Sequence, residues 1–70
     1  MQYVSNLRHY RKANKITQQE IADTLGIPRT QYIRYEAGIN ELPIRYLVAI
    51  CKAYKIDANW LLGLEEHTQL

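Results

Sequence analysis

The sequence predicts an all-α domain built from five short helices. Apolar residues recur three or four positions apart in successive segments, and no segment alternates apolar and polar residues as a half-buried strand does. Helix start and stop signals divide these segments, leaving only short loops between them. The 70 residues make one small domain spanning 1–70, and a single cysteine provides no disulfide framework. A domain of this size buries limited apolar surface, so we expect self-association to support it.

The spacing of apolar residues locates the first helix, and a capping motif locates the start of the second. Residues 3–14 carry apolar side chains at helical spacing, which predicts the first helix. Thr17 and Glu20 stand three residues apart, the spacing of a capping box in which each side chain accepts a hydrogen bond from the other residue's backbone N–H. The second helix therefore begins at Gln18. The stripe of the first helix consists of Tyr3, Leu7, Tyr10 and Arg11.

A sharp turn joins the second helix to the third. Gly26 is expected to end the second helix, because glycine adopts the left-handed conformation at little cost. Pro28 is expected in the first turn of the third helix, where a missing N–H does no harm. Ala22 stands where two steeply crossing helices approach most closely, so a larger side chain would separate them. Residues 18–36 thus form a candidate helix-turn-helix.

The third helix, predicted over residues 29–37, has two different faces. Tyr32, Tyr35 and Glu36 share the inward face, and the tyrosines join Ile21, Leu25 and Ile27 in the apolar contact between the two helices. Arginine and glutamine can each make paired hydrogen bonds to a base edge, and isoleucine can contact a thymine methyl. This composition indicates a face that reads DNA; the alternative is an ordinary solvated helix surface. The face consists of Arg29, Thr30, Gln31, Ile33 and Arg34.

Two more helices follow. Gly38 is expected to end the third helix, and Pro43 to open a fourth that runs to about Tyr54. Asp57 can cap a short fifth helix over residues 58–63. The tail, residues 65–70, has no periodicity and is expected to fray.

Charge is unevenly distributed along the chain. Residues 1–34 hold six basic and two acidic side chains, a net +4, whereas residues 35–70 hold three basic and five acidic ones, a net −2. The positive half contains the candidate reading helix, as binding to a polyanion requires.

Several classes of function are disfavoured. The chain lacks paired carboxylates, a nucleophile–base set and a phosphate-cradling loop, so we do not expect an enzyme. His9 and His67 have no partner at metal-ligand spacing, Cys51 is expected to be a small buried apolar residue, and no cofactor or metal is predicted. The sequence contains no membrane span or signal-peptide pattern, and the expected location is the cytoplasm.

The motifs together resemble the phage-repressor and Cro type of helix-turn-helix regulator, also called the xenobiotic-response-element type. The resemblance covers LRHYRKANKITQQEIADTLGIPRTQYIRYEAG and LPIRYLVAICKAYKIDANWLLGL. Its features occur in order: Arg11, Thr-Gln opening the second helix, Glu-Ile-Ala within it, the turn glycine, Tyr-Glu-x-Gly and Trp-Leu-Leu-Gly. Each feature alone is weak, whereas the whole series at this spacing is specific. The implied fold is a compact five-helix bundle of the lambda-repressor-like DNA-binding type.

The resemblance also implies roles for individual residues. Arg29, Thr30, Ile33 and Arg34 are assigned to base edges, although Arg29 and Arg34 compete as phosphate contacts. Gln18, Gln31 and Asn40 are assigned to phosphates, with an adenine contact as the alternative for Gln31. Gln18 is also expected to support the tip of the reading helix, and the backbone of residues 38–40 to receive a phosphate. Arg11 and Glu36 resemble a pair that joins the first and third helices, either on the surface or buried. The structural set is Arg11, Thr17, Glu20, Ala22, Gly26, Tyr32, Tyr35, Glu36 and Gly38, and the expected dimer contact is Trp60, Leu61 and Leu64.

Two positions depart from many relatives. Pro28 replaces a hydroxyl residue that can cap a helix or contact a phosphate, and the loop of residues 39–41 lacks the usual Lys or Arg. Fewer phosphate contacts predict a shallower salt dependence, since each neutralised phosphate contributes a slope of about −0.9.

The sequence therefore predicts a transcriptional regulator that binds duplex DNA as a homodimer. Each 29–37 helix would enter one of two successive major grooves of a pseudo-palindromic operator, with half-sites about 10 bp apart. The alternative is a protein-interaction module, antitoxin-like or co-regulator-like, that keeps the fold without reading DNA.

Overall fold

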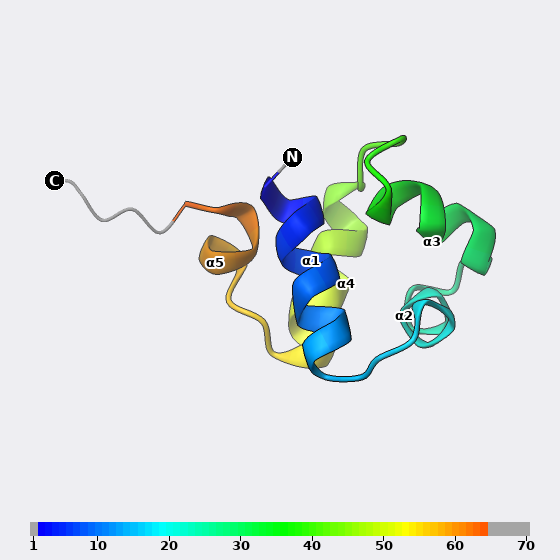
Figure 1. Ribbon diagram of the computed structural model, residues 1–70, viewed down its shortest axis with the longest axis horizontal. Helices are drawn as coiled ribbons and strands as arrows, with labels where there is room; N and C mark the ends of the chain where they lie inside the picture. The colour runs from blue at the N-terminus through cyan, green and yellow to red at the C-terminus, as the bar shows by residue number, and fades with distance from the viewer. Residues whose placement is uncertain (1, 65–70) are drawn as a thin grey trace, which may run out of the picture.

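The computed structural model describes residues 2–64, which form five α-helices: α1 (Gln2–Ala13), α2 (Gln18–Leu25), α3 (Arg29–Glu36), α4 (Ile44–Tyr54) and α5 (Ala58–Leu62). The pair α2 and α3 lies at one end of the molecule and α5 at the other, with α1 and α4 between them (Figure 1). Contacts link α2 with α3 and α4, and α1 with α3 and α5. The predicted all-α class and helix order are confirmed; the expectation for residues 65–70 lies outside the described residues.

The predicted caps at two helix starts are confirmed. Thr17 Oγ1 accepts a hydrogen bond from the Glu20 backbone N–H at 3.0 Å, and the Glu20 carboxylate accepts one from the Thr17 N–H at 2.7 Å. At α5, Asp57 accepts a hydrogen bond from the Asn59 N–H at 3.0 Å. These side chains satisfy backbone donors that have no partner within the helix.

We expect Thr17→Ala to lower the free energy of unfolding by about 0.5–2 kcal/mol, because the hydroxyl that caps α2 is lost. Urea titration followed by circular dichroism measures the change. Thr17→Ser keeps the hydroxyl and is the control, so equal losses in both variants would exclude the cap as the cause.

Pro28 and Pro43 were predicted to lie in the first turn of their helices, but each lies just before its helix. Pro28 and Pro43 both precede their helices as N-cap residues with an extended ψ of 147°. The carbonyl of Pro28 accepts the N–H groups of Gln31 and Tyr32 at 3.1 and 3.2 Å. Each proline therefore supplies the first carbonyl of a helix instead of occupying its first turn.

Helices end in left-handed residues. Gly26 has a φ of 71°, and beyond it the Ile27 N–H donates to the carbonyl of Ala22 at 3.0 Å. Gly38, with a φ of 77°, follows α3 in the same conformation, as predicted. The end of α4 was not predicted in this form, because Lys55 itself adopts a φ of 55°. Few side chains take this conformation readily, and lysine carries no sequence signal for it.

The core collects side chains from all five helices and the loops. Ile21 and Ala22 of α2 are fully buried, as a close approach of another helix at Ala22 would require. Leu42 and Ile56 were not predicted as core residues, because both lie in loops, where no helical period indicates which side chains face inward. The buried apolar side chains are Val4, Leu7, Ile21, Ala22, Tyr32, Tyr35, Leu42, Ile50, Ile56 and Leu61.

Candidate nucleic-acid interface

The two faces predicted for α3 are present in the structure. Tyr32, Tyr35 and Glu36 are buried against α1, α2 and α4. Arg29, Thr30 and Arg34 are exposed on the opposite face, while Gln31 and Ile33 are half-buried. The tip of α3 that presents Arg29 lies at the outer end of the molecule, next to α2 (Figure 1). The exposed residues assigned to bases are therefore accessible.

A buried carboxylate fixes the orientation of this helix. Arg11 of α1 donates to Glu36 twice, from Nε to Oε2 at 2.8 Å and from Nη2 to Oε1 at 2.9 Å. Gln18 Nε2 of α2 donates to Oε1 at 3.0 Å, and the Tyr32 hydroxyl donates to Oε2 at 2.7 Å. Glu36 is only 3% exposed, so the pair is buried and not a surface salt bridge. We call Arg11, Gln18, Tyr32 and Glu36 the Glu36 cluster.

The Arg11–Glu36 pair was predicted, but the two other donors to Glu36, Gln18 and Tyr32, were not. Tyr32 stands four residues before Glu36 on the same helix, so its spacing could have indicated the hydrogen bond. Gln18 was expected to support the tip of α3, and this expectation is wrong. Its amide is bonded to Glu36, at the C-terminal end of the helix, because α2 begins beside that end.

The Glu36 cluster keeps its carboxylate ionised. Burial alone would raise the pKa of Glu36, but hydrogen bonds from Arg11, Tyr32 and Gln18 outweigh burial and hold the pKa below its usual range. Burial and the bond to Glu36 raise the pKa of Tyr32, so its hydroxyl remains a donor. The hydrogen bond to Glu36 raises the pKa of Arg11. All three shifts favour an ionised Glu36, a protonated Tyr32 hydroxyl and a charged Arg11, the states in which these groups can form the hydrogen bonds of the cluster.

We expect acid to unfold the protein partly through Glu36. A lowered folded-state pKa means that the unfolded chain binds this proton more tightly, so the stabilisation is complete above the unfolded pKa of about 4.3 and is lost as the pH falls through the folded value. Thermal unfolding between pH 2 and pH 7 measures the loss. Asp23→Asn, at an exposed carboxylate outside the cluster, should follow the parent curve, whereas Glu36→Gln should flatten it. A parent curve unchanged below pH 4 would contradict the assignment.

Arg34 and Asn40 lie together beside the end of α3. Arg34 Nε donates to Asn40 Oδ1 at 2.8 Å, and both side chains are exposed. The bond uses the acceptor of Asn40 and leaves its amide N–H groups, which are the groups that can donate to a phosphate. It also leaves the terminal nitrogens of Arg34 free of hydrogen bonds within residues 2–64.

The loop after α3 differs from the expected phosphate-binding backbone. The N–H groups of Ile39 and Asn40 both donate to the Arg34 carbonyl, at 3.0 and 3.3 Å, and the Gly38 N–H donates to Tyr35. These donors already complete the end of α3. The expectation that the backbone of residues 38–40 receives a phosphate is therefore corrected, and only the Asn40 side chain remains available there.

The remaining glutamine also makes an internal contact. Gln31 Nε2 donates to the Tyr35 hydroxyl at 2.8 Å, which holds its amide along the helix and leaves one amide hydrogen free.

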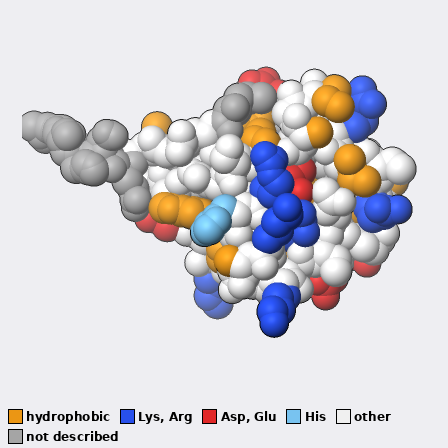
Figure 2. Space-filling view, viewed as in Figure 1, with side chains coloured by type: hydrophobic (Ala, Val, Ile, Leu, Met, Phe, Trp, Pro, Cys, Tyr) orange, Lys and Arg blue, Asp and Glu red, His pale blue; other side chains and the backbone are white. Residues whose placement is uncertain are grey.

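Lys and Arg side chains gather over α1 and toward α3, with further ones at the outer edge of this face (Figure 2). Several basic side chains are therefore present on this face of the molecule.

One of the three residues expected at a dimer contact is excluded. Leu61 is completely buried, because α5 packs against α1 and Asn6 Nδ2 donates to the carbonyls of Trp60 and Leu61 at 3.0 and 3.2 Å. Trp60 is half-buried against the core, and Leu64 is exposed. The prediction for Leu61 failed because a five-residue helix shows no period from which its inward face can be read.

Comparison with known proteins gives a consistent result. Residues 7–61 match a family model described as Helix-turn-helix. The chain is 34% identical over 64 residues to the uncharacterized HTH-type transcriptional regulator YobD of Bacillus subtilis, which covers 91% of this chain and 57% of that protein. It is 36% identical over 63 residues to the cryptic phage CTXphi transcriptional repressor RstR of Vibrio cholerae, covering 90% and 56%.

A third relative extends the match. The uncharacterized HTH-type transcriptional regulator YqaE of B. subtilis is 35% identical over 68 residues, covering 97% of this chain and 59% of that protein. The chain thus spans little more than half the length of the curated relatives it matches. No solved structure matches the chain. No helix among residues 2–64 is both long and apolar enough to cross a membrane.

Proposed function

This chain belongs to the helix-turn-helix family, and from that premise we propose that it is a transcriptional regulator that binds duplex DNA through α3. The observation that carries the proposal is the buried Glu36 cluster, which fixes α3 to α1 and α2 while Arg29, Thr30 and Arg34 stay exposed. A helix held in this way enters a major groove without rearranging, so little free energy is spent on ordering it.

We assign the contacts by position on α3. Arg29, Thr30, Ile33 and Arg34 read base edges, since arginine can pair with guanine and the isoleucine side chain can meet a thymine methyl. Gln18, Gln31 and Asn40 donate to phosphates through amide hydrogens that their internal bonds leave free. Two copies of the chain place their α3 helices in successive major grooves of a pseudo-palindromic operator. A regulatory role is supported by the relatives of this chain, which include two proteins named as HTH-type transcriptional regulators and a phage transcriptional repressor.

A salt titration tests the proposal. Fluorescence polarisation with a random-sequence duplex, from 50 to 300 mM salt, should give a log–log slope of about −0.9 for each phosphate contacted. Selection from a random oligonucleotide pool should then yield a two-half-site consensus. Salt-independent binding, or no binding, would reject the proposal.

The second candidate is a protein-interaction module that keeps the fold without reading DNA. It is favoured by the loop of residues 39–41, which has no basic side chain, and by the exposed Ile39 within it. The same titration separates the candidates, because a pure interaction module has no salt-dependent affinity for duplex DNA.

A further inference from the structure

Two exposed aliphatic side chains lie on one side of α4. Ile44, in the first turn of α4, is 79% exposed, and Val48 one turn later is 42% exposed. Isolated apolar residues on a surface are ordinary, but Ile44 also lines a groove of about 630 Å³ whose walls are mostly apolar. We call Ile44, Val48 and this groove the α4 surface.

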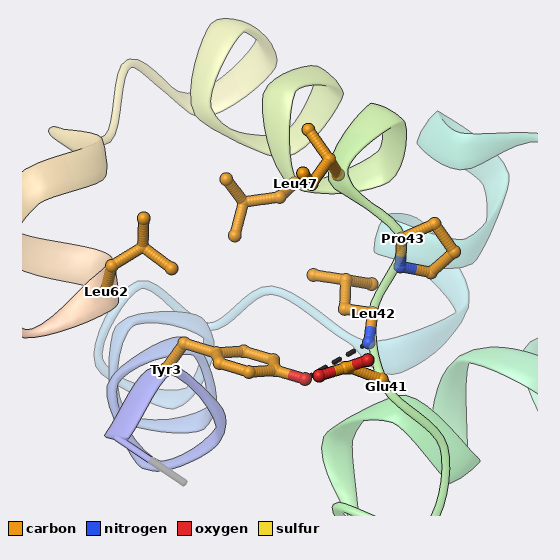
Figure 3. Close-up of a pocket in the computed structure, with 7 residues that line it drawn as sticks. Tyr3, Glu41, Leu42, Pro43, Leu47 and Leu62 are labelled. Atoms are coloured by element: carbon orange, nitrogen blue, oxygen red, sulfur yellow. Dashed lines mark hydrogen bonds between the residues drawn. The ribbon is translucent and has the colours of Figure 1, made fainter.

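The groove joins three helices and one loop. Tyr3 of α1, Leu47 of α4 and Leu62 of α5 point into it from different sides, and Leu42 and Pro43 form the end nearest α3 (Figure 3). The Tyr3 hydroxyl accepts the Leu42 N–H at 3.1 Å, which fixes one wall (Figure 3). The groove is therefore formed by ordered side chains and has room for an aliphatic group.

We propose that the α4 surface is where a second copy of this chain docks. In a two-fold contact the same patch meets itself, so a projecting side chain must find its recess on the same surface. Ile44 projects from the border of the very groove that it helps to line. The Ile44 side chain of each copy can thus enter the groove of the other, and both apolar parts of the surface are covered at once.

The charges beside the groove are also self-complementary. Glu41 and Arg45 flank Ile44 with opposite signs, and both are exposed. Arg45 lies 4.5 Å over the Tyr46 ring, and within residues 2–64 neither charge forms an ion pair. Around a two-fold axis near Ile44, Glu41 of one copy faces Arg45 of the other, and the reverse contact follows by symmetry. This arrangement favours a second copy over an unrelated partner.

The position of the surface suits the proposed operator. Ile44 follows Glu36, the last residue of α3, by eight residues, which span at most about 29 Å when extended. A two-fold axis near Ile44 therefore leaves the C-terminal ends of the two α3 helices at most about 58 Å apart, a limit that includes the spacing of successive major grooves. Successive major grooves on one face of DNA are about 34–36 Å apart. This use of the dimer rests on the proposed function, whereas the docking itself does not.

Sedimentation velocity of the 70-residue chain without DNA tests the docking. The parent should dimerise, and Ile44→Glu should weaken the dimer at least tenfold because it places a carboxylate in an apolar contact. Ala53→Glu is the matched control, because Ala53 is exposed on the same helix about two and a half turns beyond Ile44, on the opposite side, and it should leave the dimer intact. A monomeric parent at all concentrations, or a dimer that withstands Ile44→Glu, would overturn the proposal.

Charge exchange gives a second measurement that does not depend on the apolar contact. Glu41→Arg alone and Arg45→Glu alone should each weaken the dimer, because each places like charges opposite one another. The double variant should recover the parent affinity, and a failure to recover would argue for a different partner surface. Binding of each variant to a single half-site tests the proposed function separately, since a monomer with intact α3 still binds it.

Discussion

Replacing Arg11 with methionine is expected to lower the free energy of unfolding by about 3–5 kcal/mol. The guanidinium provides two of the four hydrogen bonds to Glu36, whose side chain is almost completely buried. Its removal leaves a carboxylate without its compensating charge, and it also removes the 2.9 Å bond from Nη1 to the Ile16 carbonyl. Small domains have only about 5–15 kcal/mol of stability, so the variant should be partly unfolded near body temperature.

Urea denaturation at pH 7 measures this loss. Lys12→Met removes a neighbouring but exposed positive charge from the same helix and should change stability by less than about 0.5 kcal/mol. Combining Arg11→Met with Glu36→Gln completes a double-mutant cycle, in which the two losses should be strongly non-additive. Additive losses would mean that the pair is not coupled in solution.

Replacing Arg29 with alanine is expected to weaken binding to the cognate operator by about 1–3 kcal/mol and to relax the preference at one base pair. Arg29 is the first residue of α3 and is fully available at its tip. Only DNA that has a guanine at this position can form the bidentate contact, so only that DNA loses it in the variant. Binding to unrelated sequences should therefore fall much less.

Parallel selection from one random oligonucleotide pool, with the parent and the variant, measures this change in preference. Lys12→Ala is the comparison, because an exposed lysine of α1 can add only to the field around the phosphates. It should weaken binding on all sequences alike and reduce the salt slope by about one. The same uniform loss for Arg29→Ala would make Arg29 a phosphate contact.

The helix boundaries followed from local chemistry, which the sequence contains explicitly. The Thr17–Glu20 capping box and the Asp57 cap lie where residue type and spacing place them. The inward and outward faces of α3 could also be predicted, because the regular 3.6-residue period of an α-helix determines which side chains share a face. The left-handed Lys55 could not be predicted, because lysine has no preference for this conformation. The contacts that accompany it are the burial of the next residue, Ile56, and the 3.0 Å bond from the Ile56 N–H to the Cys51 carbonyl.

Longer-range arrangements were less accessible to sequence reasoning. The pairing of Arg11 with Glu36 came from family resemblance, whereas the burial of that pair depends on how α1 crosses α3. Leu61 was assigned to the surface because WLL alone does not reveal which leucine faces inward. Gln18 was placed at the wrong end of α3 for a similar reason, since the crossing of α2 and α3 determines which residue it meets.

The three-way attachment of Glu36 has a consequence for fluctuations of the native state. One carboxylate binds groups on α1, α2 and α3, so none of these helices can separate without breaking bonds of the other two. Their most protected amide hydrogens should exchange with solvent in a single cooperative opening, at a common free energy. α5 is tied to α1 through Asn6 alone among the described side-chain hydrogen bonds, and it can open at a lower free energy. The part of the molecule that we propose to contact DNA should therefore open at a higher free energy than α5.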